Sequence, residues 1–334
     1  MKSYSVDSHT RAKPGSSGAH DPAVIDCTAQ AAPSSFYSDN SLFTPLLEAL
    51  DASPTARSIV SFAAHRGWSL DLGEIEGGAY QLDIDAQILR INSYGLRPAA
   101  TAASGYFRHT MILSLVRGLR DIWHLECRQP HYRGLSIESI LLLERVRTAD
   151  CDVIALLAAW ELRGAGQTDI WRHLIGSPEG DMALVFGRML EYEPGAHFSG
   201  TGGASHALTN AFARWFEDPL RISACDHASL EAMDEEILEG RHKEIYGREP
   251  VSAFFIESLS RLPDRSYYLE GYGREILKNP AFSGLDDDVN QAHFLQINRD
   301  LNSTVAGGVA FRDARLARVI FPEENALARE TLQN

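Results

Sequence analysis

The period of the hydrophobic pattern changes within the first third of the 334-residue sequence, and this change constrains the fold more than any other feature. Before it, apolar and polar residues alternate over the short segments 68–72, 79–84 and 88–92, as in half-buried strands. After it, apolar residues recur every three to four positions over 106–127 and 136–163, which predicts two long helices. We therefore expect an α+β protein that is mostly α-helical, with a small three-stranded sheet.

Local signals place the remaining elements. Ser53-Pro54 supplies an N-cap and a first-turn proline for a helix that runs to about residue 65, and Gly67 ends it. Ser136 is a favourable N-cap for the second long helix. Further helices are expected at 42–50, 169–175, 180–190, 205–216, 230–239, 251–261, 267–278 and 288–302.

Composition divides the chain into three expected parts. Residues 1–40 are rich in Ser, Ala, Pro, Gly and Asp, which predicts a flexible tail. Residues 41–239 contain the strands and the long helices. Residues 240–334 are expected to form a helical C-terminal extension packed on that part.

Charge and cysteine usage limit the partners and the compartment. The net charge of -14 disfavours binding to nucleic acid and to anionic membranes. The N-terminus has no apolar secretory segment, and the cysteines form no CxxC pair, which favours free thiols in a reducing cytoplasm. We therefore expect a cytoplasmic protein. The cysteines are Cys27, Cys127, Cys151 and Cys225.

The order of helix, strand, hairpin, long helix and second helix resembles the frame of the zincin metallopeptidases. In those enzymes the long helix carries H-E-x-x-H, in which two histidines bind zinc and the glutamate activates the bound water. A third ligand comes from the following helix. A zincin-like arrangement is therefore expected for residues 41–239.

The long helix is similar to that of a bacterial family of uncharacterised metallopeptidase-like proteins. The family helix reads roughly H-E-L-R-H-x-W-Q, and residues 117–124 read R-G-L-R-D-I-W-H. The segments 144–151 and 159–163 also resemble the family, the latter with an A-W-E-L-R stretch. The resemblance fails at the metal-site positions. Arg117 and Asp121 stand at the two histidines, Gly118 at the glutamate and Thr148 at the acidic third ligand.

This pattern implies a chain that has lost its metal, so we expect neither a zinc ion nor another cofactor. Arg117 and Asp121 lie four residues apart and are expected to form an ion pair on one helical face. Arg120, His124 and Asp150 are expected to line the former substrate cleft.

The resulting hypothesis is a catalytically inactive, regulatory protein that binds a protein or peptide. The expected surface is the cleft beside the strand edge 88–92 and the helix 106–127. One alternative is a metal-dependent hydrolase with a rearranged site, and another is a structural role for residues 240–330. Ligands for a rearranged site would come from Asp121, His124, Glu126, His131 and Asp150. The oligomeric state stays open.

Overall fold

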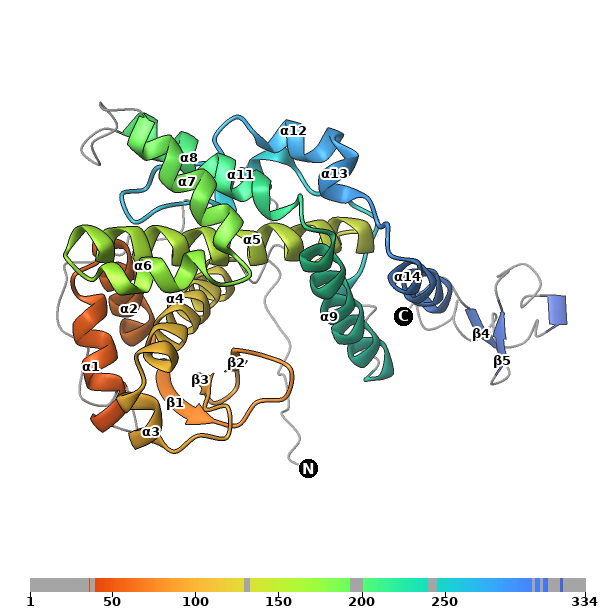
Figure 1. Ribbon diagram of the computed structural model, residues 1–334. Coiled ribbons are helices and arrows are strands. Elements are labelled where there is room, and N and C mark those ends of the chain that lie inside the picture. The colour runs from red at the N-terminus through yellow and green to blue at the C-terminus, as the bar shows by residue number, and fades with distance from the viewer. Residues whose placement is uncertain are drawn as a thin grey trace, which may run out of the picture.

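The computed structural model describes residues 36, 40–128, 133–192, 201–239, 245–301, 304–306, 309–311 and 319–320. Helices dominate these residues, and a small sheet lies at one edge of the molecule against α4; the mostly α-helical α+β class is as predicted (Figure 1). Within this part of the chain, no helix is long and apolar enough to cross a membrane. Almost all of the predicted tail, 1–40, lies outside the described residues. Phe36 is an exception, since it is buried and its carbonyl accepts a hydrogen bond from Leu70 N.

The first two helices form where the local signals place them. Helix α1 spans Asn40–Leu50 and α2 spans Pro54–His65. The Ser53 side chain accepts a hydrogen bond from the backbone N–H of Ala56, and Pro54 occupies the first turn. Gly67 follows with a φ of 85°, a conformation that favours glycine.

The three predicted strands form one mixed sheet. They are β1 (Ser69–Gly73), β2 (Tyr80–Asp83) and β3 (Ile88–Asn92), arranged in the order β1-β3-β2. Strand β3 pairs in parallel with β1 and antiparallel with β2, so it is the central strand. The expectation of a strand edge at 88–92 is therefore wrong. The edge on the hairpin side is β2, because β1 occupies the other side of β3.

Two long helices form the centre of the molecule. Helix α4 (Gly105–Arg128) packs against α5 (Ile137–Gly164), against α2 and against the sheet, and the short α3 (Pro98–Ala103) precedes it. Ser136 caps α5 as predicted, through a hydrogen bond from Ser139 N. Helix α5 is buried along most of its length, which is why its sequence is apolar on nearly all sides.

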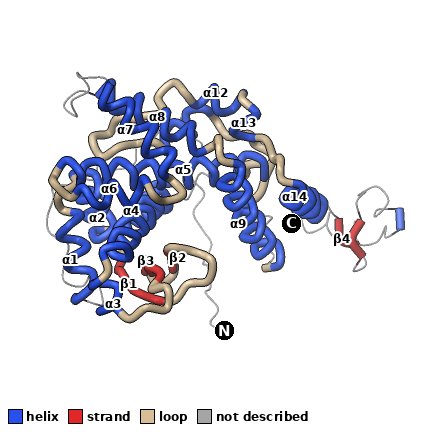
Figure 2. Tube along the Cα trace, viewed as in Figure 1, coloured by secondary structure: helices blue, strands red, loops and turns tan. Residues whose placement is uncertain are grey.

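Most of the remaining helices pack against α5, from several directions (Figure 2). The expected helix at 230–239 is only the end of a longer helix, α9, that begins at Pro219. The expected helix at 267–278 begins only at Gly273, after a turn in which Gly271 has a φ of 78°. The elements are α6 (Thr168–Ile175), α7 (Gly180–Tyr192), α8 (Thr201–Trp215), α9 (Pro219–Leu238), α11 (Ala253–Leu259), α12 (Gly273–Lys278), α13 (Pro280–Ser283), α14 (Asp288–Leu301), β4 (Thr304–Ala306) and β5 (Val309–Phe311).

The described C-terminal helices share the core of the rest of the chain. Helices α11 and α13 pack against α5, and α14 packs against α9. One hydrophobic cluster extends from Phe36 to Ile297 and includes residues of α4, α5, α9 and α11. Strands β4 and β5 form an antiparallel pair that was not predicted.

Candidate functional site

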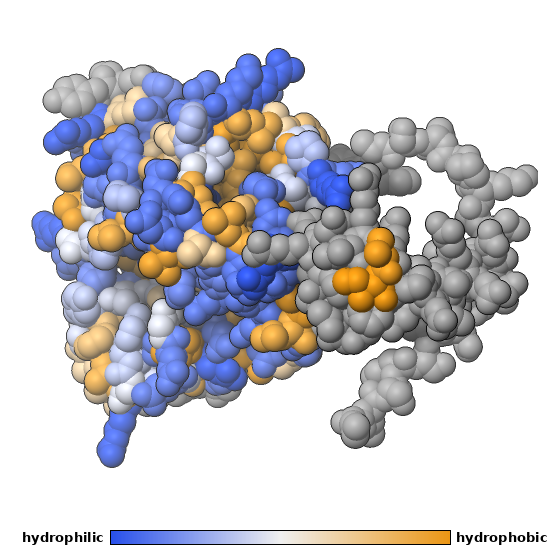
Figure 3. All heavy atoms as spheres, turned by 90° about the vertical axis from the view of Figure 1, so that its right-hand side faces the viewer, coloured by the Kyte–Doolittle hydropathy of each residue, from blue (hydrophilic) through white to orange (hydrophobic). Residues whose placement is uncertain are grey.

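A cleft of about 820 Å³ opens between the β2 edge, α5 and α9. Its α9 wall carries Ala224, Ala228 and Ala232, which recur every four residues and leave room because their side chains are small. Thr148, at the third-ligand position, also lines it. Seen from the α14 side, hydrophilic and hydrophobic residues are interspersed over the surface (Figure 3). The cleft is lined by Gly78, Ala79, Tyr80, Ile84, Ile140, Glu144, Arg147, Thr148, Asp152, Trp215, Arg221, Ala224, Cys225, Ala228, Ser229, Ala232, Met233, Glu236 and Tyr246.

Gly118, the residue that the sequence resemblance aligns with the catalytic glutamate, is covered by the sheet. A Cβ atom on Gly118 would lie 2.5 Å from Leu89 Cδ1 and 3.2 Å from Tyr80 Cδ2. Leu89 belongs to the central strand and is fully buried. The space beside Gly118 is therefore occupied by side chains of β3 and β2, and a glutamate does not fit there without displacing them.

Arg117 forms its ion pairs with other helices and not with Asp121, which corrects the expectation from spacing. Its Nε donates to Asp152 Oδ1 at 2.5 Å, and its Nη2 lies 3.0 Å from Glu179 Oε1 in an ion pair without hydrogen-bond geometry. Asp152 also accepts from Trp215 Nε1 at 2.9 Å. Two carboxylates thus share one guanidinium. Although burial opposes it, the two carboxylates raise the pKa of Arg117 above its ordinary value.

The two acids respond differently to this shared cation. Burial raises the pKa of Asp152 despite the guanidinium beside it. The pKa of Glu179 falls instead, because Arg117 and a hydrogen bond from Ser177 outweigh its burial. Of the two carboxylates beside the Arg117 guanidinium, that of Glu179 therefore loses its proton more readily than that of Asp152.

Asp121 is held by a different arginine. The Nε atom of Arg147, a residue of α5, lies 2.9 Å from Asp121 Oδ1. Arg147 also donates a hydrogen bond from Nη1 to Glu144 Oε1 at 3.2 Å. The Tyr80 hydroxyl donates to the other Asp121 oxygen at 3.3 Å. Burial raises the pKa of Tyr80 well above its ordinary value, so this hydroxyl keeps its proton.

Thr148 is exposed and lies apart from these ion pairs. Its hydroxyl is 3.4 Å from Cys225 Sγ, across the cleft on α9. Burial raises the pKa of Cys225 to about 11, so the thiol is protonated at neutral pH and is a poor nucleophile.

Three residues separate the cleft from α4. Tyr80, Arg147 and Asp152 line the cleft, and each also contacts one of the former metal-site positions of α4. We call these three residues the partition. Arg117, Gly118 and Asp121 therefore lie behind the partition and are not part of the cleft lining.

Arg120, His124 and Asp150 do not line the cleft, which corrects a second expectation. They are 1%, 1% and 0% exposed. Asp150 accepts from Arg120 Nε at 2.5 Å, from His124 Nε2 at 2.7 Å and from the Tyr268 hydroxyl at 2.8 Å. The guanidinium of Arg120 also stacks 4.1 Å from the ring centre of Trp123. This cluster ties α4 and α5 to the segment that follows α11.

The charges inside this cluster are balanced without a charged histidine. Burial opposes the ionisation of Asp150, but Arg120 and His124 hold its pKa below its ordinary value. Burial lowers the pKa of His124 to about 4, since Arg120 already neutralises the carboxylate that faces it. His124 is therefore neutral at pH 7 and donates through Nε2, as expected for a histidine held by a hydrogen bond.

The residues at the former metal-site positions do not fit a zinc site. Arg117 and Gly118 offer no ligand atom, and both oxygens of Asp121 are already engaged. In the part of the chain that the structure describes, no three His, Cys, Asp or Glu side chains converge as metal ligands. Of the alternative ligands, His131 lies outside the described residues, and Glu126 accepts from Trp68 Nε1 at 2.8 Å.

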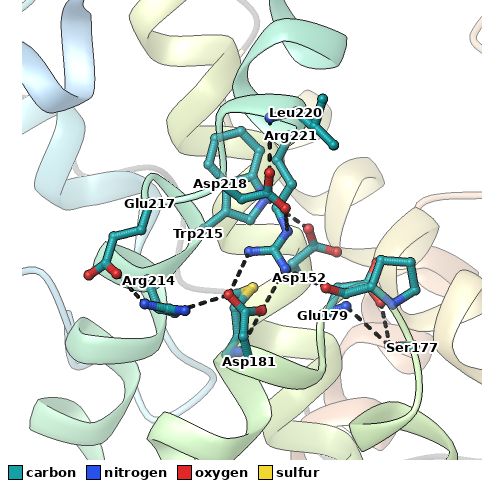
Figure 4. Close-up of polar contacts among 12 residues, drawn as sticks. Asp152, Ser177, Glu179, Asp181, Arg214, Trp215, Glu217, Asp218, Leu220 and Arg221 are labelled. Atoms are coloured by element: carbon teal, nitrogen blue, oxygen red, sulfur yellow. Dashed lines mark hydrogen bonds and ion pairs between the residues drawn. The ribbon is translucent and has the colours of Figure 1, made fainter.

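A second charged cluster adjoins one end of the cleft (Figure 4). Arg221 lines the cleft and reaches Asp181 Oδ1 at 2.5 Å, while Arg214 Nε donates to Asp181 Oδ2 at 2.9 Å. Although partial burial opposes it, the two guanidiniums lower the pKa of Asp181.

Sequence reasoning missed this cluster, and it also missed Asp152. A signal for Asp152 was present, because an acid within an apolar helix requires a partner.

Comparison with known proteins identifies the family. A family model described as "Putative metallopeptidase family (DUF6782)" matches residues 103–269. No curated protein and no solved structure matches the chain. The matched range contains α4, α5 and α9, the helices that carry the former metal-site positions and the cleft. The chain therefore belongs to this metallopeptidase family.

Proposed function

We propose that this chain is a non-catalytic member of its family that binds a peptide segment of another protein through the cleft between β2, α5 and α9. The observation that carries the proposal is the partition. It has an open cleft on one side and the three α4 positions, Arg117, Gly118 and Asp121, on the other, with the two charged side chains held in ion pairs.

The contacts of the three α4 positions support the proposed absence of catalysis. A zinc peptidase needs a water-activating carboxylate beside the metal and an open path for the substrate. Here a glycine packs against Leu89 at the position of that carboxylate. Arg117 and Asp121 hold α4 to α5 and to the loop before α7 through ion pairs. The side chains of Arg117 and Asp121 are held in ion pairs with other side chains of the protein, so neither is placed to act on a substrate.

Peptide binding is supported by the strand edge and by the shape of the cleft. Strand β2 pairs with β3 on one side, and no described strand pairs with its other side. An unpaired strand edge can add an extended peptide through main-chain hydrogen bonds, and adjacent pockets then select its side chains. The cleft offers aromatic surface at Tyr80 and Tyr246, together with charged side chains in its lining. Its volume lies within the range of ligand-binding clefts.

The binding half of the proposal is tested with a displayed random peptide library selected on the full chain. Ala228 is exposed and lines the cleft, so Ala228→Trp fills the cleft without entering the core. Ala281→Trp is the matched control, since Ala281 is exposed on α13 and does not line the cleft. We expect peptides whose affinity falls at least about tenfold in the first variant and less than about twofold in the second. If no selected peptide is sensitive to Ala228→Trp, the proposed cleft is not the binding site.

The catalytic half is tested by elemental analysis of the protein purified without added metal. We expect less than about a tenth of an equivalent of zinc, manganese, iron or nickel, because the described ligand atoms do not converge. About one equivalent of a bound metal, together with peptide hydrolysis that a chelator abolishes, would establish the metal-dependent hydrolase instead.

A further inference from the structure

A second recess lies between α6 and α7, on residues that take no part in the cleft. It has a volume of about 450 Å³, and we call it the α6–α7 groove. The two helices pack against each other, and α6 also packs against α5 (Figure 1). Two properties of the α6–α7 groove matter for binding: the positive charge of its lining, and the exposed apolar side chains of its walls.

The groove is positively charged on an acidic protein. Its lining contains Arg163, Arg172, Arg188 and one acid, Glu191, so the formal charge is 3 − 1 = +2, whereas the whole chain carries -14. Even when Asp169, which pairs with Arg172 outside the lining, is counted, the charge remains +1. A cationic recess attracts acidic segments, although the protein as a whole is acidic.

The three arginines are not equivalent. Arg163 stacks 4.3 Å from the ring centre of Trp160 and pairs with Glu191 at 3.1 Å, so it is fixed in place. Arg172 pairs with Asp169, but their side chains are 75% and 72% exposed, and such a pair contributes little. Arg188 is exposed and has no ion pair with a described residue. Arg188 is therefore available to bind a carboxylate of a ligand, and Arg172 can exchange its exposed pair with Asp169 for a second one.

The groove also has apolar walls. Ile175 of α6 is 38% exposed and Leu184 of α7 is 44% exposed, and both line the recess. Trp171 lies buried beneath them, and a Cβ atom on Gly187 would be only 3.3 Å from its Cζ2 atom. The glycine lets α7 approach the tryptophan ring and leaves a depression above it. An apolar side chain of a ligand would be desolvated here.

We propose that the α6–α7 groove binds an acidic peptide segment of a partner protein. A bulky apolar side chain of the segment packs between Ile175 and Leu184, and flanking carboxylates face Arg172 and Arg188. A small anion alone would leave the apolar walls exposed to water. A nucleic acid would meet the net charge of -14 on the surrounding protein. An acidic segment with an apolar anchor satisfies both features of the groove.

The test uses a displayed random decapeptide library, selected on the full-length protein at low salt and depleted on the R172E/R188E variant. Both arginines are exposed, so the reversal leaves the core intact, and circular dichroism checks the fold. Arg274→Glu is the matched control, because Arg274 is an exposed arginine on α12 outside the groove. A fluorescein-labelled peptide from the selection then gives affinities by anisotropy.

We expect selected peptides with at least two acidic residues beside a bulky apolar residue. Their affinity should fall about tenfold or more in R172E/R188E, and Leu184→Ser should weaken them as well. R274E and the cleft variant A228W should stay within about twofold of the unsubstituted protein, which separates this groove from the cleft. The proposal is overturned if no peptide depends on Arg172 and Arg188, or if a version with lysine in place of each acid binds equally well.

Discussion

Gly118 provides the most direct test of how the structure closes the former metal site. Replacement by alanine adds one methyl group to the face of α4 that meets the sheet. That methyl would lie 2.5 Å and 3.0 Å from the two terminal carbons of Leu89. Leu89 is 0% exposed, so its side chain has no free space into which it can move.

The expected change in stability combines two opposing effects. Overpacking of a filled core costs about 1–3 kcal/mol, whereas alanine is favoured over glycine within a helix by about 1 kcal/mol. With a mid-range overpacking cost of about 2 kcal/mol, Gly118→Ala should lower the free energy of unfolding by about 1 kcal/mol. In a Leu89→Ala background the clash with Leu89 disappears and only the 3.2 Å approach to Tyr80 Cδ2 remains, so the same substitution should raise the free energy of unfolding by up to about 1 kcal/mol. The sign reversal corresponds to a coupling of up to about 2 kcal/mol.

Urea denaturation of the four proteins in this cycle, followed by tryptophan fluorescence, measures both effects. Leu89→Ala alone should cost about 2–5 kcal/mol, so the comparison is made within each background. Gly164→Ala is the control, because Gly164 ends α5, is exposed and has no atom within 4 Å of an added Cβ. If Gly118→Ala is equally stabilising with and without the Leu89 side chain, Leu89 does not close this position.

Other predictions concern the buried charges and the metal. Because the pKa of His124 is lowered to about 4, the unfolded chain takes up a proton below about pH 6.5 that the folded chain does not. The free energy of unfolding should therefore decrease by about 3 kcal/mol between pH 6.5 and pH 4, and His124→Gln should remove this decrease in urea titrations at each pH. Arg145→Ala should cost about 3–5 kcal/mol in thermal unfolding, since it leaves Asp226 buried without its cation, and a change below about 1 kcal/mol would contradict this. The variant R117H/G118E/D121H/T148E should bind less than about a tenth of an equivalent of zinc by elemental analysis, and one full equivalent would refute the closure of the site.

Local signals in the sequence predicted those elements whose ends are determined by short-range contacts. Ser53 and Ser136 cap α2 and α5 as expected, because an N-cap needs only a side-chain oxygen and a backbone N–H a few residues on. The three strands were predicted from their alternating pattern of apolar and polar residues. The order of the strands in the sheet was not predicted, because the pairing of β1 with β3 depends on how the chain between them crosses the sheet.

Helix α9 shows where hydrophobic periodicity fails. The expected helix began at 230, although Asp218-Pro219 carries the same cap and first-turn proline as Ser53-Pro54. The buried residues of α9 are only Asp226, Leu230 and Met233, so the apolar pattern of the helix is sparse. The other residues of α9 face solvent or the cleft, or are partly buried against α5 and α14. A cap signal was present, but the periodicity that normally accompanies it was too weak to extend the helix.

The contacts around the candidate site were not predictable from the sequence. Sequence spacing can reveal partners four residues apart on one helix, and it therefore suggested the pair of Arg117 with Asp121. In the structure, the Arg117 guanidinium forms ion pairs with Asp152 and Glu179, and Asp121 forms its ion pair with Arg147. These partners come from other parts of the chain. Such pairs depend on the crossing of α4 with α5, which no local pattern specifies.

The contacts behind the partition also indicate why single substitutions should not rebuild a metal site. Each former metal-site position of α4 has a different partner: Arg117 contacts Asp152, Gly118 contacts Leu89, and Asp121 contacts Arg147. Replacing Arg117 with histidine would leave Asp152 and Glu179 without their cation, and a buried unpaired carboxylate is costly. A glutamate at 118 would first require a smaller residue at 89. Because neighbouring changes of this kind are not additive, a return to zinc binding requires coordinated changes in α4, α5 and β3 together.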